Sequence, residues 1–179
     1  MKQNKIVIAF SGKRGVGKTL SAHYLAANYG FTHISFAECL KTLSKNLFPF
    51  SGDDLYGETK EEKFKEYEWT PRDFMIKFGQ FMRYFDSNYW VERIDLKGER
   101  IVIDDLRYEN EYHFLTEQGA KLIRIERYKS LNPYKEELND ESENALDSFK
   151  FDYVIKEQNN GTKTDLYASL HRIIKNLTL

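Results

Sequence analysis

The sequence predicts an α/β protein in which helices cover both faces of a mostly parallel, five-stranded sheet, in three layers. Two observations predict this class. Residues 5–10 form a short apolar run, and a glycine-rich turn leads from it directly into a helical pattern at residues 18–29. From there to the end of the chain, short apolar segments alternate with helical ones. Strands that alternate with helices pair in parallel, because each crossover helix returns the chain to the same end of the sheet.

Each expected element has a local cause. The run at residues 5–10 is rich in branched apolar side chains, as in a strand that is buried on both faces. The helix at residues 18–29 is expected to end at Gly30 in a left-handed conformation. Apolar runs predict further strands at residues 32–36, 100–105, 121–126 and 151–155. Helical periodicity predicts helices at residues 109–118 and 163–176, the second with an apolar stripe.

Two segments interrupt this alternation within what we expect to be a single domain, residues 1–179. Residues 37–99 are too many for one crossover helix, so we expect an inserted helical region there that binds substrate. Residues 128–147 are polar and acidic. They predict either a short lid over a site or a solvated surface loop, and both interpretations stay open.

Composition limits the classes of partner. The 179 residues carry 27 basic and 28 acidic side chains, a net charge of -1, so no global field would gather nucleic acid or an anionic membrane. We therefore expect neither as a partner. Cys39 is the single cysteine, and the first apolar run is too short for a signal peptide or a membrane span. These features favour the cytoplasm.

A phosphate-binding loop is the most specific motif in the chain. It fits glycine, any four residues, glycine, lysine, then serine or threonine, and it comprises Gly12, Lys13, Arg14, Gly15, Val16, Gly17, Lys18 and Thr19. Its place between a strand and a helix argues against a chance match, because the helix N-terminus and successive backbone N–H groups then surround one anion. Lys18 would reach the β- and γ-phosphates of ATP, and the Thr19 hydroxyl would bind Mg²⁺. The motif refines the fold class to a P-loop NTPase fold. Lys13 can be a solvated side chain of the loop instead of a phosphate ligand.

A second cluster follows the apolar strand expected at residues 100–105. The strand ends in Asp104 and Asp105, and Arg107 comes two residues later. Ligands of open parallel sheets lie beyond the carboxyl ends of the strands, so a carboxylate here can hold Mg²⁺ opposite Thr19. We assign this role to Asp105, although the sequence does not decide between the two aspartates. Arg107 can bind phosphate oxygens with its planar guanidinium, or form a surface ion pair with a neighbouring aspartate.

The insert contains a helix with a clear start. Thr70 can cap it, Pro71 suits its first turn, and Asp73 completes a capping box. One face carries an aromatic stripe that we expect in the core, namely Phe74, Met75, Phe78, Phe81, Met82 and Phe85.

The opposite face of the same helix carries candidate acceptor-binding residues, namely Arg72, Gly79, Gln80 and Arg83. Two arginines and an amide suit a nucleoside monophosphate, whereas a solvated polar face is the alternative. Trp90 can stack on a base or belong to the core. Lys41 can likewise bind a phosphate or be a solvated surface side chain.

Several further motifs, together with this loop, resemble the deoxynucleoside monophosphate kinases of bacteriophages and large viruses. They are Phe10-Ser11-Gly12, Ile34-Ser35-Phe36-Ala37, Leu40-Lys41, Thr70-Pro71-Arg72, Tyr89-Trp90-Val91, Ile103-Asp104-Asp105-Leu106-Arg107-Tyr108-Glu109-Asn110-Glu111, Leu122-Ile123-Arg124-Ile125-Glu126-Arg127, Ser142-Glu143, Phe151-Asp152-Tyr153-Val154-Ile155 and Asn160-Gly161-Thr162. The order matches across most of the chain. Where relatives often have a histidine before the Ser-Glu pair, this chain has Asp140-Glu141.

The resemblance implies a nucleoside-monophosphate-kinase-like fold and transfer of the γ-phosphoryl group of ATP, with Mg²⁺, to the 5′-phosphate of a deoxynucleotide. Arg72, Arg107 and Arg127 stand where that family places basic residues around substrate phosphates. The catalytic residues that we expect are Lys18, Asp105, Arg107 and Arg127.

Two other functions stay open. Dephospho-coenzyme A kinases share the phosphate loop and the fold. A nucleotide-dependent switch is a different class, but residues 162–165 form a capping box rather than a guanine-binding motif, and no glycine follows the two aspartates in the spacing of a GTPase. The base preference and the oligomeric state are open as well, with a homodimer as one alternative.

Overall fold

The computed structural model describes residues 5–127, 144–157 and 162–178, which form two compact units. The larger unit is Met1–Ser35 with Leu96–Leu179, and the smaller unit is Phe36–Asp95. Most of the segment that we expect to be a lid, residues 128–143, lies outside the described residues. The described remainder, residues 144–147, belongs to a turn before the last strand.

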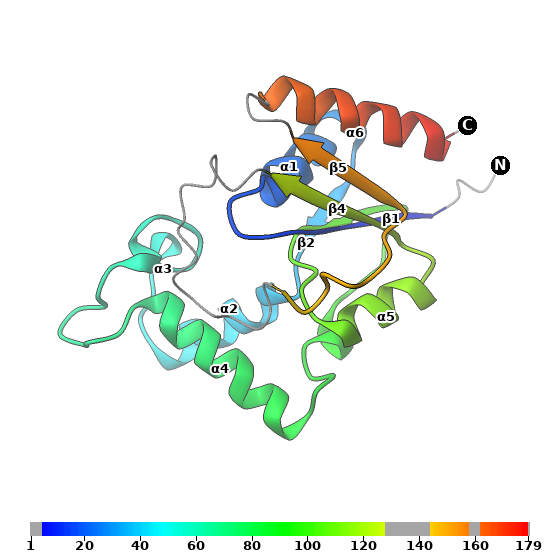
Figure 1. The fold of residues 1–179 in the computed structure, drawn as a ribbon. Helices are drawn as coiled ribbons and strands as arrows, with labels where there is room; N and C mark the ends of the chain where they lie inside the picture. Colours follow the sequence, from blue (N-terminus) through cyan, green and yellow to red (C-terminus); the bar gives the residue numbers. More distant parts are fainter. Residues whose placement is uncertain (1–4, 128–143, 158–161, 179) are drawn as a thin grey trace. The chain divides into compact units, whose positions relative to one another are not determined.

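A five-stranded parallel sheet forms the centre of the larger unit, in the order β2-β3-β1-β4-β5 (Figure 1). The strands are β1 (Ile6–Ser11), β2 (Thr32–Ile34), β3 (Arg100–Ile103), β4 (Lys121–Arg127) and β5 (Tyr153–Glu157). Every neighbouring pair runs parallel, which confirms the predicted sheet. β2 and β3 end two residues earlier than expected.

β5 begins two residues later than expected, and a side chain explains the shift. The Asp152 carboxylate accepts the Leu122 amide at 2.9 Å and the Lys121 ammonium at 3.0 Å. A carboxylate therefore takes the place of a backbone carbonyl at the start of this ladder. The pattern of apolar residues does not reveal such a substitution.

Three helices cover the sheet of the larger unit (Figure 1). They are α1 (Lys18–Tyr29), α5 (Glu109–Glu117) and α6 (Lys163–Thr178). α1 and α6 lie on one face and α5 lies on the other, as the three-layer prediction requires. The core between the sheet and the helices α1 and α6 includes Ile8, Phe10, Val102, Leu25 and Leu170. Alternate residues of β1 and β4, such as Ile8 and Phe10 or Ile123 and Ile125, thus face these helices.

The smaller unit is helical and has an aromatic core. It contains α2 (Ala37–Leu47), α3 (Gly52–Tyr56), α4 (Pro71–Phe85) and two 3₁₀ turns, η1 (Thr59–Glu61) and η2 (Val91–Arg93). Phe50, Leu55 and Phe64 are buried at its centre. The residues packed around them are Phe48, Trp69, Phe74 and Met75. Most of these contacts are edge-to-face, as between Phe48 and Phe74 at 4.9 Å between ring centroids.

The prediction that the whole aromatic stripe of α4 is core is wrong for its second half. Phe74 packs on the aromatic core, but Phe81 is 58% exposed and Phe85 is 69% exposed. Gly79, expected on the polar face, is buried instead. The aromatic core of this unit lies beside the first turns of α4, and the buried Trp90 packs farther along the helix at Phe78 and Gly79. A helical stripe indicates which residues share a face, but not how far along the helix a partner extends.

The cap of α4 agrees with the prediction. Thr70 Oγ1 accepts the Asp73 amide at 3.1 Å, and the Asp73 carboxylate accepts the Thr70 amide at 3.0 Å. The hydrogen bond from the Thr70 backbone holds the pKa of Asp73 below 3.8. Because the folded pKa is depressed, this stabilisation is present above pH 3.8 and is lost as the pH falls through the folded pKa.

We expect Asp73→Asn to lower the free energy of unfolding by about 1 kcal/mol at pH 7, since the charged cap at the helix N-terminus is lost. The difference from wild type should disappear below the folded pKa, where Asp73 is protonated in both states of the wild-type protein. Urea denaturation followed by circular dichroism at pH 7 and in acid measures both values. A difference that persisted unchanged in acid would contradict the assignment to the Asp73 charge.

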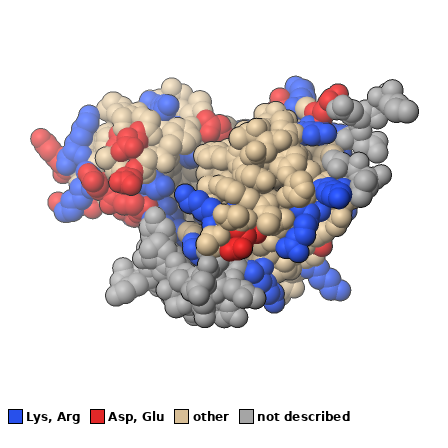
Figure 2. Space-filling model, turned by 90° about the horizontal axis from the view of Figure 1, so that it is seen from above, with Lys and Arg blue, Asp and Glu red and all other residues tan. Residues whose placement is uncertain are grey.

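Charge and hydropathy of the described part agree with the composition. Basic and acidic side chains occur together on the face that Figure 2 shows, as expected for a net charge of -1. Within the ranges described above, no helix is both long and apolar enough to cross a bilayer.

Candidate functional site

The phosphate loop connects β1 to α1 through glycines in left-handed conformations. The φ angles of Gly12, Gly15 and Gly17 are +140°, +80° and +104°. Residues other than glycine rarely adopt positive φ angles of this size. The loop conformation therefore requires glycine at these three positions. Turns of this kind direct successive backbone N–H groups toward one centre, where they bind an anion. The conformation thus supports the phosphate-binding motif.

Close packing gives two of these glycines a second role. A Cβ atom added at Gly12 would lie 2.3 Å from the carbonyl oxygen of Ile125 on β4. One added at Gly17 would lie 3.2 Å from Cδ2 of Leu166 on α6. The loop is therefore held directly against the neighbouring strand and the last helix, with no room for a side chain at its base.

Lys18 reaches back across the loop that precedes it. Its side chain donates to the carbonyl oxygens of Gly12 and Lys13, the second at 2.9 Å, and the residue is 8% exposed. Thr19, by contrast, is exposed on the first turn of α1. The Ser21 hydroxyl closes this turn by donating to the Gly17 carbonyl at 2.9 Å. The ammonium group and the threonine hydroxyl thus lie at the start of one helix, where nucleotide phosphates and a metal ion would bind.

The two aspartates after β3 have different surroundings. Asp104 is 9% exposed, and its Oδ1 lies 3.0 Å from Nε2 of His33 on β2, whereas Asp105 is half-buried. Because β2 and β3 pair with His33 beside Val102, and Val102 packs in the core under α1, His33 faces α1. Asp104 follows the end of β3, and its contact with His33 places it on the same side. The assignment of the metal to Asp105 stays a prediction. His33 was missed, because nothing in its sequence context distinguishes it from a core histidine.

Arg127 lies at the carboxyl end of β4, and Arg107 lies in the segment between β3 and α5. Glu111, 2% exposed, accepts the backbone amides of Arg107 at 2.9 Å and Tyr108 at 3.1 Å, which fixes the chain between β3 and α5. Arg127 ends β4, the neighbour of β1. Since the strands are parallel, the phosphate loop, the two aspartates and both arginines lie along one edge of the sheet.

A third arginine, Arg124, was also missed. It lies on β4 in register with Ser11, the residue before the phosphate loop, and is 9% exposed. Its guanidinium donates to Ser11 Oγ at 3.3 Å and to the carboxylate of Asp147, and lies 5.7 Å from the ring of Phe151. A signal was present in the sequence, because Arg124 interrupts an otherwise apolar run. Its partner Asp147 was not predictable, since the two residues are 23 positions apart.

We expect Asp147→Ala to lower the free energy of unfolding by about 1–2 kcal/mol, because it leaves the charge of Arg124 buried without this carboxylate. In the double variant with Arg124→Met the loss should be smaller than the sum of the two single losses. Glu126→Ala, which breaks an exposed ion pair with Lys156 in the same unit, should change the stability by less than about 0.5 kcal/mol. Strictly additive effects in urea denaturation would show that Arg124 and Asp147 are not coupled.

Apart from Arg107, the expected acceptor-binding residues lie in the smaller unit, with varied surroundings. Nη1 of Arg72 lies 3.2 Å from Oε1 of Glu61, and Arg83 is half-buried next to Gly79. Gln80 is exposed. Trp90 is 2% exposed, and its Nε1 donates to the Gly79 carbonyl at 3.1 Å. For Trp90 this arrangement favours the alternative of a core residue.

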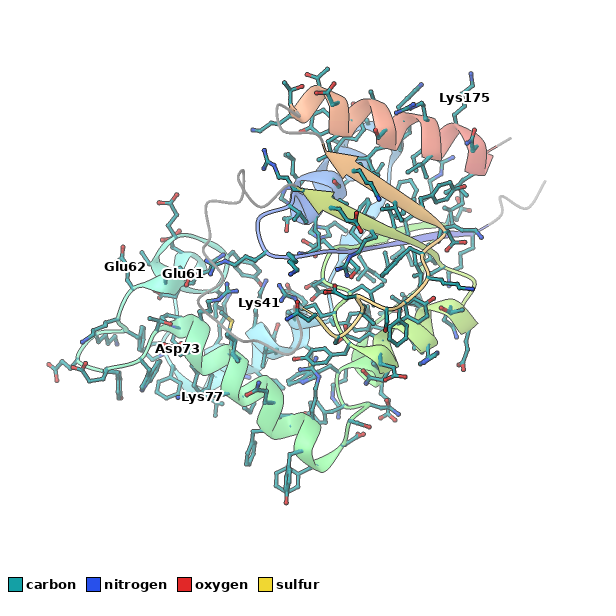
Figure 3. All side chains as sticks on the ribbon, viewed as in Figure 1. Lys41, Glu61, Glu62, Asp73, Lys77 and Lys175 are labelled. Carbon is teal, nitrogen blue, oxygen red and sulfur yellow. The ribbon has the colours of Figure 1, made fainter. Side chains whose placement is uncertain are left out.

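Lys41 projects from α2 (Figure 3) and lies over an aromatic ring. Its Nζ is 4.1 Å from the ring centre of Tyr56, whose hydroxyl donates to Oε1 of Glu38 at 2.7 Å. Partial burial, followed by the neighbouring Glu38 carboxylate, raises the pKa of Tyr56 to about 12. The tyrosine therefore stays neutral at physiological pH. Its ring can hold the Lys41 ammonium while a carboxylate lies close by.

The donor atoms at the edge of the sheet fit a magnesium ion that arrives with a nucleotide. No group of three or more histidine, cysteine or acidic side chains that could hold a metal occurs in the described part of the chain. Mg²⁺ does not need one, because it keeps several waters and uses one or two protein oxygens together with substrate phosphates. The exposed hydroxyl of Thr19 and the carboxylates after β3 are donors of that kind.

Comparison with known proteins agrees with this geometry. The "Putative deoxynucleotide monophosphate kinase" of Acanthamoeba polyphaga mimivirus is 32% identical over 143 residues, which cover 68% of this chain and 74% of that protein. The chain belongs to the deoxynucleotide monophosphate kinase family. The resemblance noted in the sequence is thereby confirmed. No family model matches the chain.

A solved structure supports the fold of this family member. The dephospho-CoA kinase from Campylobacter jejuni superposes with a TM-score of 0.55 at 15% identity, and the match covers 96% of each chain. The P-loop kinase fold that the sequence predicted is confirmed.

Proposed function

We propose that the protein transfers the γ-phosphoryl group of ATP to the 5′-phosphate of a deoxynucleoside monophosphate, giving the diphosphate for DNA synthesis. The observation that carries the proposal is the phosphate loop, with its three left-handed glycines and the Lys18 side chain folded over it. Membership in the deoxynucleotide monophosphate kinase family supports the choice of acceptor. Both substrates are cytoplasmic metabolites, so we place the reaction in the cytoplasm.

The donor nucleotide binds at the loop. The N–H groups of residues 12–19 surround the β-phosphate, and the Lys18 ammonium exchanges its carbonyl partners for β- and γ-phosphate oxygens. Lys13 and Arg14 add positive charge at the entrance. Bound Mg²⁺, held by Thr19 and a carboxylate after β3, would neutralise charge on the β- and γ-phosphates.

Transfer proceeds by in-line attack of an oxygen of the acceptor phosphate on the γ-phosphorus, without a covalent enzyme intermediate. The bond from the γ-phosphorus to the oxygen that bridges it to the β-phosphate breaks, and ADP leaves. The acceptor is already anionic, so no general base is required. The residues accelerate the reaction by positioning the two substrates and by stabilising negative charge on the transferring group. We assign the second task to Lys18, Arg107 and Arg127.

The acceptor binds to residues of the smaller unit. Lys41, Arg72 and Arg83 supply positive charge for its phosphate, and Gln80 supplies an exposed amide that can form hydrogen bonds with a base. The contact between Arg72 and Glu61 limits the orientation of the guanidinium before substrate binds. We assign Trp90 to the core of the smaller unit and not to the acceptor site.

A coupled ADP-release assay tests the proposal. ATP and Mg²⁺ are combined with each of the four common deoxynucleoside monophosphates, with their ribose counterparts and with dephospho-coenzyme A. We expect one or more deoxynucleotides to accelerate ADP release, which also identifies the base. Acceleration by dephospho-coenzyme A alone would replace the acceptor that we propose. If no acceptor had an effect although ATP bound, a nucleotide-dependent switch would be the better interpretation.

A further inference from the structure

We propose that His33 is a positioning residue that holds Asp104 on the α1 side of the sheet, and that Asp104, rather than Asp105, faces the magnesium ion of the bound nucleotide. This inference rests on the proposed function and deepens it. His33 Nε2 lies 3.0 Å from Asp104 Oδ1, with side chains that are 26% and 11% exposed. At this degree of burial, water competes only weakly for the contact.

The contact belongs to a short row of polar side chains that leads from the phosphate loop. Thr19 and His23 are four residues apart on α1, so they lie on the same face of that helix. The ring of His23 meets the ring of His33 edge to face, with 5.2 Å between their centroids. His33 in turn contacts Asp104. The row therefore connects the helix turn that carries Thr19 with the first carboxylate after β3.

The contact with His33 places Asp104 on the α1 side of the sheet. Val102 packs in the core beneath α1, and His33 is its partner in register on β2. Both aspartates follow the end of β3 at Ile103, and Asp104 is the one that lies 3.0 Å from His33. α1 packs against both β2 and β3, so the Asp104 side is the one that Thr19 also occupies.

A residue in the position of His33 affects metal binding because it orients the carboxylate that binds the metal. Partners that hold a metal-binding carboxylate in one orientation reduce the entropy lost on binding, and removing such a partner typically weakens metal affinity by about 10–100-fold. His33 lies on β2, whereas Asp104 lies just after the end of β3. It can therefore hold the carboxylate independently of the turn that follows β3.

The test compares ADP affinity with Mg²⁺ and with EDTA, by calorimetry on the full chain. The ratio of the two dissociation constants reports how far the metal strengthens nucleotide binding. We expect His33→Leu to reduce this ratio about 10-fold with little change in EDTA. His33→Gln, which keeps a polar side chain at this position, should retain more of the ratio than His33→Leu. Asp104→Asn should reduce the ratio more than Asp105→Asn does. His113→Leu, on the exposed surface of α5, is the matched control and should equal wild type.

Two outcomes would overturn the inference. One is a wild-type ratio in His33→Leu, and the other is a larger loss in Asp105→Asn than in Asp104→Asn. Equal weakening of ADP binding with and without Mg²⁺ in His33→Leu would indicate a purely structural role and would also contradict it. The measurement needs no acceptor. A negative result in the acceptor panel would therefore contradict the proposed function without affecting this comparison.

Discussion

Replacing Lys18 with alanine is expected to lower kcat for phosphoryl transfer by about 1,000-fold, the size of effect found when a donor aimed at developing charge is removed. Lys18 is buried at the start of α1, and its ammonium lies over the carbonyl oxygens of Gly12 and Lys13. No other described lysine combines burial with this place in the loop. Initial rates with saturating ATP and the best acceptor measure the loss.

A matched control for this variant is Lys175→Ala. Lys175 is exposed near the end of α6, so the change should leave kcat within about twofold, as is usual for surface positions. Thermal denaturation of Lys18→Ala shows whether the fold persists. Full transfer activity in Lys18→Ala would refute the mechanism, since charge neutralisation by this side chain is central to it.

Gly12→Ala is expected to lower the free energy of unfolding by about 3 kcal/mol, through backbone strain and overpacking. The new Cβ would lie 2.3 Å from the Ile125 carbonyl oxygen and 3.1 Å from Cγ2 of Val16. Backbone atoms of a central strand cannot move aside easily. In a chain of this size the loss corresponds to a fall in Tm of roughly 6–12 °C. Nucleotide binding should also weaken, because the base of the loop must shift.

Gly98→Ala separates the effect of backbone strain from the effect of overpacking. Gly98 has a φ angle of +145°, close to the +140° of Gly12, but an added Cβ would lie 3.5 Å from Cγ1 of Ile101, an ordinary contact. It shares the unfavourable φ angle without the collision. We expect about 1 kcal/mol of destabilisation for Gly98→Ala. If both variants lost the same stability in thermal and urea denaturation, the packing of Gly12 against β4 would not be the cause.

The features that sequence alone predicted are local ones. The phosphate loop needs glycines at set positions, and its lysine and threonine follow in the next two positions, so the motif is complete within eight residues. The capping boxes at Thr70 and Thr162 each span four residues, and the structure contains both. The parallel sheet follows from the alternation of short apolar runs with helices. All of these depend on neighbours in the chain.

Only the tertiary structure decided which residues meet across the sheet and in the cores. The contacts of His33 with Asp104 and of Arg124 with Asp147 join residues from separate elements. The choice of partner depends on register and packing, which the spacing of residues in the sequence does not encode. The burial of Trp90 and the exposure of Phe81 have the same origin, since both depend on where the core of the smaller unit ends. The sequence therefore determined the loop and the order of elements, whereas packing decided which carboxylate faces α1.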